Sequence, residues 1–112
     1  MTEFKQDDEI TPVIFRKYGP GRGGEVIALF PAEAYDLQGY LCSSYVHVGQ
    51  HGSADPHHVV RYTRPAKPDE YAALKAELEA VPYGYRLKVY SREQPAHRAA
   101  RMQQARDWRA RA

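Results

Sequence analysis

The sequence contains a single cysteine, one tryptophan and three phenylalanines, and no apolar run approaches membrane-spanning length. With Cys42 alone, a disulfide within the chain and a cysteine-rich zinc site are both excluded. Residues 1–11 are acidic and polar and lack the charged-then-apolar pattern of a signal peptide. These absences predict a cytoplasmic protein with no membrane partner.

The 112 residues present are 43% apolar and 27% charged, which predicts one globular domain with one hydrophobic core. Nine tyrosines are typical of half-buried sheet faces and of surfaces that contact a partner. The net charge of +2 is unevenly distributed, since the segment from Pro95 onward carries +4 and the rest carries −2. Any electrostatic argument for a nucleic-acid partner therefore depends on the C-terminal segment.

Two β-prone runs flank a glycine-rich loop near the start of the chain. Residues 12–18 and 25–30 are rich in β-branched and aromatic side chains, and the sequence GPGRGG lies between them. Its glycines favour a tight turn, and the Lys-Ser/Thr pair that a phosphate-binding P-loop requires is missing. We therefore predict a hairpin whose second strand ends at Pro31.

Three further strands and one helix are expected later in the chain. Residues 40–48, 58–63 and 85–90 have strand character, with a bend at 49–52 and a turn or one helical turn at 53–56. Residues 68–81 predict a helix, because Pro68 opens it, Asp69 and Glu70 lie in its first turn, and apolar side chains recur at helical spacing.

This order of elements predicts an α+β fold, with a small, mainly antiparallel sheet of four to five strands and one helix packed on one face. Residues 1–11 are expected to form a loose leader and residues 12–92 a single domain. Residues 93–112 are rich in Ala, Arg and Gln. They predict either a basic helix that docks through Trp108 or a disordered extension.

Five strings, in this order, extend the interpretation: VIFRKY, GEVIALFP, SYVHVGQHG, RPAKPDEYAALKAEL and YRLKVY. Together they resemble a group of small uncharacterised bacterial proteins associated with phages, plasmids and other mobile elements, and the resemblance covers residues 13–92. It implies a compact domain that travels on mobile DNA, with no known activity to transfer. Lys67 departs from the pattern, which has a helix-capping Thr there, and the Arg-rich segment after Arg92 lies outside it.

The histidines between residues 47 and 58 suggest metal binding. In a straight strand, the imidazoles of His47 and His51 would lie about 13 Å apart, so they would meet only if the chain folds back at Gly49. The set His51, Asp55 and His57 is the arrangement that a bound zinc would need, although its spacing matches no zinc motif.

Two other interpretations concern the same stretch. Cys42 with His47, or Ser44 with a histidine, would be a nucleophile and base pair, but a buried, inert cysteine is the simpler interpretation. In a purely structural role, His51 would hold the bend by bonding backbone carbonyls and Asp55 would cap the turn that begins at Pro56.

A basic, tyrosine-containing surface would instead suit nucleic acid, because cations pair with phosphates and aromatic rings stack on bases. Besides the C-terminal arginines, the residues of such a surface would be Arg61, Arg64, Arg86, Lys88, Arg92, Tyr62, Tyr85 and Tyr90. No helix-turn-helix, zinc-finger or RRM pattern accompanies them.

The leading hypothesis is therefore a non-enzymatic interaction module that binds a protein or nucleic-acid partner without a cofactor. Its expected binding residues are His47, His51, Asp55, His57, Tyr62, Arg86, Lys88 and Tyr90. The alternative is a small metal-assisted hydrolase or nuclease that uses zinc at His51, Asp55 and His57. An exposed strand edge would in addition allow a homodimer.

Overall fold

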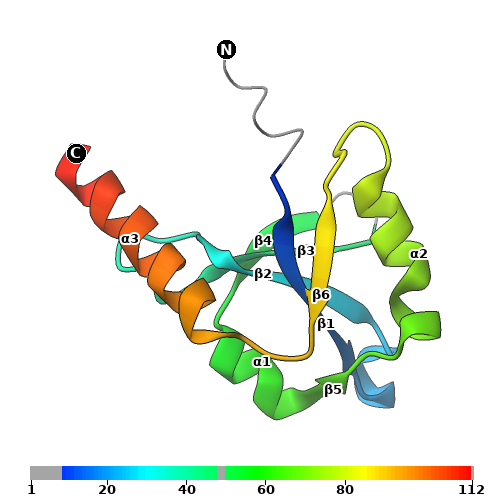
Figure 1. The fold of residues 1–112 in the computed structure, drawn as a ribbon. Coiled ribbons are helices and arrows are strands. Elements are labelled where there is room, and N and C mark those ends of the chain that lie inside the picture. The colour runs from blue at the N-terminus through cyan, green and yellow to red at the C-terminus, as the bar shows by residue number, and fades with distance from the viewer. Residues whose placement is uncertain (1–8, 48–49, 112) are drawn as a thin grey trace.

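In residues 9–47 and 50–111, which the computed structural model describes, six strands form one sheet and three α-helices pack around it (Figure 1). The strands are β1 (Thr11–Tyr18), β2 (Val26–Ala34), β3 (Cys42–Val46), β4 (Gln50–Ala54), β5 (Thr63–Pro65) and β6 (Leu87–Tyr90). The helices are the short 3₁₀ turn η2 (Pro20–Arg22), α1 (Pro56–Tyr62), α2 (Pro68–Glu79) and α3 (Pro95–Arg111). The predicted α+β class is confirmed, and so is a C-terminal helix.

The sheet has the strand order β4-β3-β2-β1-β5, and all of these neighbours are antiparallel. β6 pairs in parallel with the first half of β1, from Thr11 to Ile14, while β5 pairs with the second half of the same edge. One long strand therefore organises the sheet, and the prediction of a mainly antiparallel sheet is confirmed.

The glycine-rich loop closes the β1–β2 hairpin, as the sequence predicts. Gly23 and Gly24 have φ angles of 70° and 67°, which glycine adopts without strain. The Gly23 N–H donates to the carbonyl of Pro20 over 2.9 Å, and the Gly24 N–H donates to the carbonyl of Gly19 over 3.1 Å. Both amides are thus used within the turn itself.

The prediction that β2 ends at Pro31 is wrong, because this strand continues to Ala34. Its pairing with β3 is regular up to Phe30 and resumes at Ala34, with a β-bulge between these two residues. Proline is tolerated there because the ladder is interrupted and the missing N–H removes no strand-to-strand hydrogen bond.

The strand expected at residues 58–63 is helical in the structure, where residues 56–62 form α1. Asp55 caps this helix by accepting from the N–H groups of His57 and His58 at 2.9 and 3.4 Å, as its predicted capping role requires. At the other end, the buried Arg16 side chain donates to the carbonyls of Val60 and Thr63 at 3.3 and 2.8 Å. A local cap thus fixes the start of the helix and long-range hydrogen bonds from Arg16 fix its end, which the strand-like composition does not reveal.

The predicted strand 40–48 is shorter than expected, and residues 50–54, predicted as a bend and the start of a turn, form β4. β3 spans Cys42–Val46 and pairs along its length with β4, so that Tyr45 lies opposite His51. Val48, the last residue of the predicted strand, lies outside the described residues. Cys42 and Tyr45 point to opposite faces and both are fully buried, because helices cover the sheet on both sides.

The core has two halves, one on each face of the sheet. On one face, Leu74 and Leu78 of α2 pack against strand residues that include Val13, Phe15 and Phe30. On the other face, Val59 of α1 packs into a cluster of strand residues. The members of that cluster are Ile14, Ile27, Leu29, Cys42, Ala54 and Val59. No described helix is long and apolar enough to cross a membrane.

The Arg-rich segment forms a helix over Pro95–Arg111 that docks against β2, in agreement with the helical alternative. Its buried residues are His97, Arg101 and Ala105, while Trp108 is half-buried. Close packing against Gly39 is possible because that residue has no Cβ, which would lie 2.8 Å from the Met102 sulfur. One of the five C-terminal arginines therefore belongs to the core.

Candidate functional site

His47 and His51 are brought to the α2 side of the sheet by the β3–β4 hairpin, which folds the chain back as their convergence would require. The His47 Nδ1 atom lies 2.6 Å from a carboxylate oxygen of Glu77, and the other oxygen accepts from the buried Tyr45 hydroxyl. The ring of His51 packs edge-on against Tyr45 and Tyr83, with centroids 4.7 and 5.3 Å apart. The two histidines are therefore linked through the hydrogen bond that Tyr45 donates to Glu77.

Asp55 and His57 lie elsewhere, at the start of α1. The Asp55 carboxylate binds backbone N–H groups, and His57 Nε2 lies 3.9 Å from the Glu93 carboxylate. Each residue of the proposed zinc set thus has a different neighbour. Within residues 9–47 and 50–111, no three His, Cys, Asp or Glu side chains are arranged to hold a metal ion.

The expected tyrosine and arginine surface is divided as well. Tyr62 is 61% exposed on a flank of α1, where its ring contacts His58. On β6, Lys88 lies over the Tyr90 ring at 5.4 Å, and the same ring packs against His97 of α3 at 4.5 Å. Tyr90 therefore supports the start of α3 and is only half-exposed.

Cys42, the candidate nucleophile, is fully buried among apolar side chains of the α1 face. Burial raises the pKa of its thiol to about 12, so the thiol is protonated at neutral pH. This environment fits the inert cysteine of the sequence interpretation.

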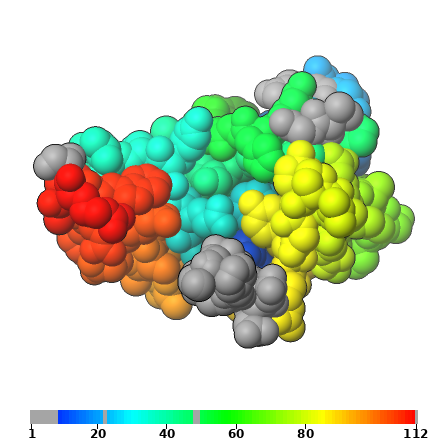
Figure 2. All heavy atoms as spheres, turned by 90° about the horizontal axis from the view of Figure 1, so that it is seen from above, coloured from blue at the N-terminus to red at the C-terminus, as the bar shows by residue number. Residues whose placement is uncertain are grey.

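The described surface has a more distinctive feature at the bulge of β2, which sequence reasoning did not select. Two adjoining cavities of about 310 and 460 Å³ meet there and share Glu9, Thr11 and Glu33 in their walls. In Figure 2, α3 and the segment around residues 80–90 stand apart, with the cyan surface of the β2 end visible between them. We call the two cavities together the Glu33 groove.

The β-bulge creates this groove and α3 completes it. Because pairing with β3 is interrupted, backbone groups of the bulge need other partners. Arg101 of α3 donates to the Pro31 carbonyl at 2.6 Å, and the side-chain carbonyl of Gln104 accepts from the Ala34 N–H at 2.7 Å. The helix thus provides hydrogen-bond partners for these backbone groups of the bulge, and the Glu33 side chain is left directed into the groove.

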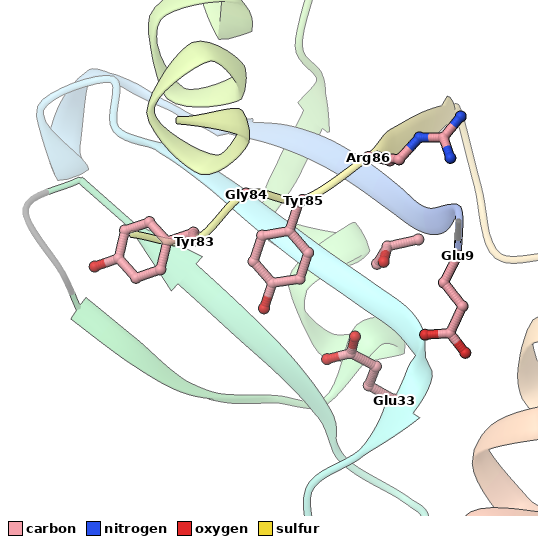
Figure 3. Close-up of a pocket in the computed structure, with 7 residues that line it drawn as sticks. Glu9, Glu33, Tyr83, Gly84, Tyr85 and Arg86 are labelled. Carbon is pink, nitrogen blue, oxygen red and sulfur yellow. The ribbon is translucent and has the colours of Figure 1, made fainter. Parts of the chain in front are cut away.

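Two carboxylates and a tyrosine hydroxyl face this space. Figure 3 shows the carboxylate of Glu33 and the hydroxyl of Tyr85 directed toward each other, with the Glu9 carboxylate nearby and the Arg86 side chain extending away. Burial raises the pKa of Glu33, and the negative charge of Glu9 adds to this effect. The pKa of Tyr85 is also raised, first by burial and then by Glu33. The groove therefore disfavours the negatively charged form of Glu33.

Aromatic rings form the walls on both sides of these carboxylates. Tyr83 and Tyr85 line one cavity, and Trp108 of α3 lines the other. The ring of Tyr85 is fixed by stacking on Phe30 at a centroid distance of 5.3 Å. Carboxylates between aromatic faces recognise ammonium and guanidinium groups, which pair with the charge and are attracted to the rings.

Comparison of the chain with protein-family models, with curated proteins and with solved structures finds no significant match.

Some signals for the groove are present in the sequence, but they require the tertiary structure to be understood. Glu33 stands between two alanines after a proline, which suggests a surface connection and gives no hint of a bulged strand. Trp108 was expected to dock α3, and the structure also makes it a wall of the groove. Arg86, one of the predicted binding residues, lines the groove from the position immediately before β6.

Proposed function

We propose that this chain is a cytoplasmic, non-enzymatic interaction module of mobile-element origin, and that it takes a lysine or arginine side chain of a protein partner into the Glu33 groove. The observation behind the proposal is the half-buried carboxylate of Glu33, which lies beside Glu9 and between aromatic walls. Perturbed carboxyl groups of this kind are concentrated at functional sites, because their environment disfavours charge until a ligand compensates it.

A cationic side chain suits the groove on three physical grounds. Its charge offsets the repulsion between the neighbouring carboxyl groups of Glu33 and Glu9, which contributes to the raised pKa of Glu33. Its N–H groups can donate to carboxylate and hydroxyl oxygens at the same time. The tyrosine and tryptophan rings add cation–π attraction of about 0.5–2 kcal/mol.

A protein partner is favoured over nucleic acid because phosphates would be repelled by the carboxylates of the groove. The buried Arg101 is no longer available for phosphate, since its guanidinium bonds Gly39, Pro31 and Glu93. The exposed arginines of α3 are the basis of the nucleic-acid alternative; they are Arg98, Arg106, Arg109 and Arg111.

The sole tryptophan of the chain lies in the groove and provides a direct assay. A five-residue Gly/Ser peptide with one central lysine should change the Trp108 fluorescence in the millimolar range, and a peptide with norleucine in place of the lysine should not. Glu33→Gln should abolish the response. Glu25→Gln, which removes an exposed carboxylate from the β1–β2 hairpin, is the matched control and should keep it.

Two outcomes would contradict the proposal. An equal response to the norleucine peptide would show that charge is not recognised. Retention of a single-stranded oligonucleotide in a low-salt gel shift, unchanged in Glu33→Gln and lost in an Arg98→Gln/Arg106→Gln variant, would favour the nucleic-acid alternative.

A further inference from the structure

A second, chemically different cavity lies on the opposite face of the sheet. It measures about 320 Å³ and is bounded by α1 and by the segment that joins β6 to α3. Ile14 and Leu29 form its floor, and both are among the most buried residues of the core, with exposures of 2% and 0%. Pro56 and Val60 of α1 form one wall. We call this cavity the α1 slot.

Charged groups gather where the slot opens to solvent, and their balance is positive. Glu93 is matched internally, because one of its oxygens lies 2.6 Å from the Nη1 atom of the buried Arg101. His57 is exposed and its Nε2 atom lies 3.9 Å from the other Glu93 oxygen. Arg92 lines the slot and is exposed. A guanidinium and an imidazole are thus available beside an apolar cavity.

We propose that the α1 slot binds a small amphipathic monocarboxylate, such as a medium-chain fatty acid. Its apolar chain lies against Ile14, Leu29 and Val60, and its carboxylate binds Arg92 and His57. The arrangement has the features of small-molecule sites, which are mainly apolar, a few hundred Å³ in volume and equipped with a few polar groups at one end.

The charge distribution selects this ligand class. A neutral apolar molecule would leave the guanidinium of Arg92 without a counter-charge, whereas a cationic amphiphile would be repelled by it. The depth of the slot favours a free small molecule over a flat protein surface, because the floor consists of core side chains that only a narrow apolar group can reach.

Octanoate is the probe, and its binding is observed through the methyl signals of Ile14, Leu29 and Val60 in a ¹³C-labelled sample. Titration should shift these signals saturably, while octanol and octylamine should bind at least about tenfold more weakly. The Kd for octanoate should rise about tenfold in Arg92→Gln, which corresponds to about 1.4 kcal/mol. Arg98→Gln removes an exposed arginine of α3 outside the slot and should leave the Kd unchanged.

Several results would overturn this proposal. Absence of saturable methyl shifts with octanoate would reject it, as would equal affinity for octanol or an unchanged Kd in Arg92→Gln. Binding of a Leu-Leu-Asp peptide without binding of octanoate would assign the slot to a peptide partner instead. Because the assay reads the slot methyls and not Trp108, its result is independent of the lysine-peptide assay of the Glu33 groove.

Discussion

The Glu33 groove and the α1 slot are both built on β2, yet their chemistry is opposite. The slot takes its floor from Leu29, where the ladder with β1 and β3 is regular and alternate side chains enter the core. The groove begins a few residues later, where the bulge interrupts the ladder and directs a carboxylate outward. Regular pairing thus produces an apolar cavity, whereas its interruption produces a polar one.

The side chain of Arg101 connects the two regions. Arg101 is 1% exposed, and its guanidinium bonds the Pro31 carbonyl beneath the groove and the Glu93 carboxylate at the slot. The Nε atom also donates to the Gly39 carbonyl at 2.8 Å. Both regions therefore depend on the docking of α3.

Arg101→Met should have the largest effect, because it removes the connection itself. The variant leaves the Glu93 carboxylate and two carbonyls without their donor, and we expect a loss of about 3–5 kcal/mol in the free energy of unfolding. Urea denaturation measures this loss, with Arg98→Met on the exposed side of α3 as the control. A change below about 1 kcal/mol would mean that α3 docks mainly through its apolar residues.

Gly39→Ala should weaken the same docking through steric contact and backbone strain. Gly39 has a φ of 78°, and a Cβ there would meet the Met102 sulfur at 2.8 Å and the Ala105 methyl at 3.2 Å. We expect a loss of about 2 kcal/mol in thermal or urea unfolding. Gly21→Ala is the control, since nothing lies within 4 Å of its added Cβ. Equal losses in both variants would contradict this account.

Glu33→Gln in the groove should change how the stability of the protein depends on pH. The folded-state pKa of Glu33 is raised, so ionisation destabilises the folded protein as the pH rises from the ordinary carboxyl range through the raised value. The stability of the variant minus that of the wild type should therefore be larger at pH 7 than at pH 4. Melting temperatures at the two pH values measure the difference.

Glu70→Gln provides a control of opposite sign. The hydrogen bonds from Arg64, and then from the Lys67 N–H, lower the pKa of Glu70 to about 2. Its stabilising effect is present above the ordinary carboxyl range and is lost as the pH falls toward 2. The stability of the variant minus that of the wild type should thus be smaller at pH 7 than at pH 2. The same trend in both variants would contradict the assignment for Glu33.

Val60→Ala should have the smallest effect on stability and still separate the two cavities. Val60 is 44% exposed, so shortening it should lower the free energy of unfolding by less than about 1 kcal/mol. It should weaken octanoate binding several-fold and leave the response of Trp108 to the lysine peptide unchanged. Equal changes in both assays would show that the cavities are coupled.

The amino-acid sequence determined the features that depend on local chemistry. The start of α2 at Pro68, the hairpin at the glycine-rich loop and the alternation along β6 follow from backbone preferences and side-chain periodicity. The α+β class follows from these elements, because an amphipathic helix and half-apolar strands must bury their faces together.

The tertiary structure alone decided the features that depend on distant partners. Residues 58–62 include the β-branched Val59 and Val60 but are helical, and the buried Arg16, far away in the sequence, satisfies the carboxyl end of α1. β4 is a strand because it pairs with β3, although its own residues have little strand preference. Glu33 lies at a candidate site because α3, seventy residues later in the chain, satisfies the Pro31 carbonyl and leaves the carboxylate facing the groove. The hydrogen bonds of Arg16 and Arg101 form only when segments far apart in sequence pack together, so no local pattern specifies them.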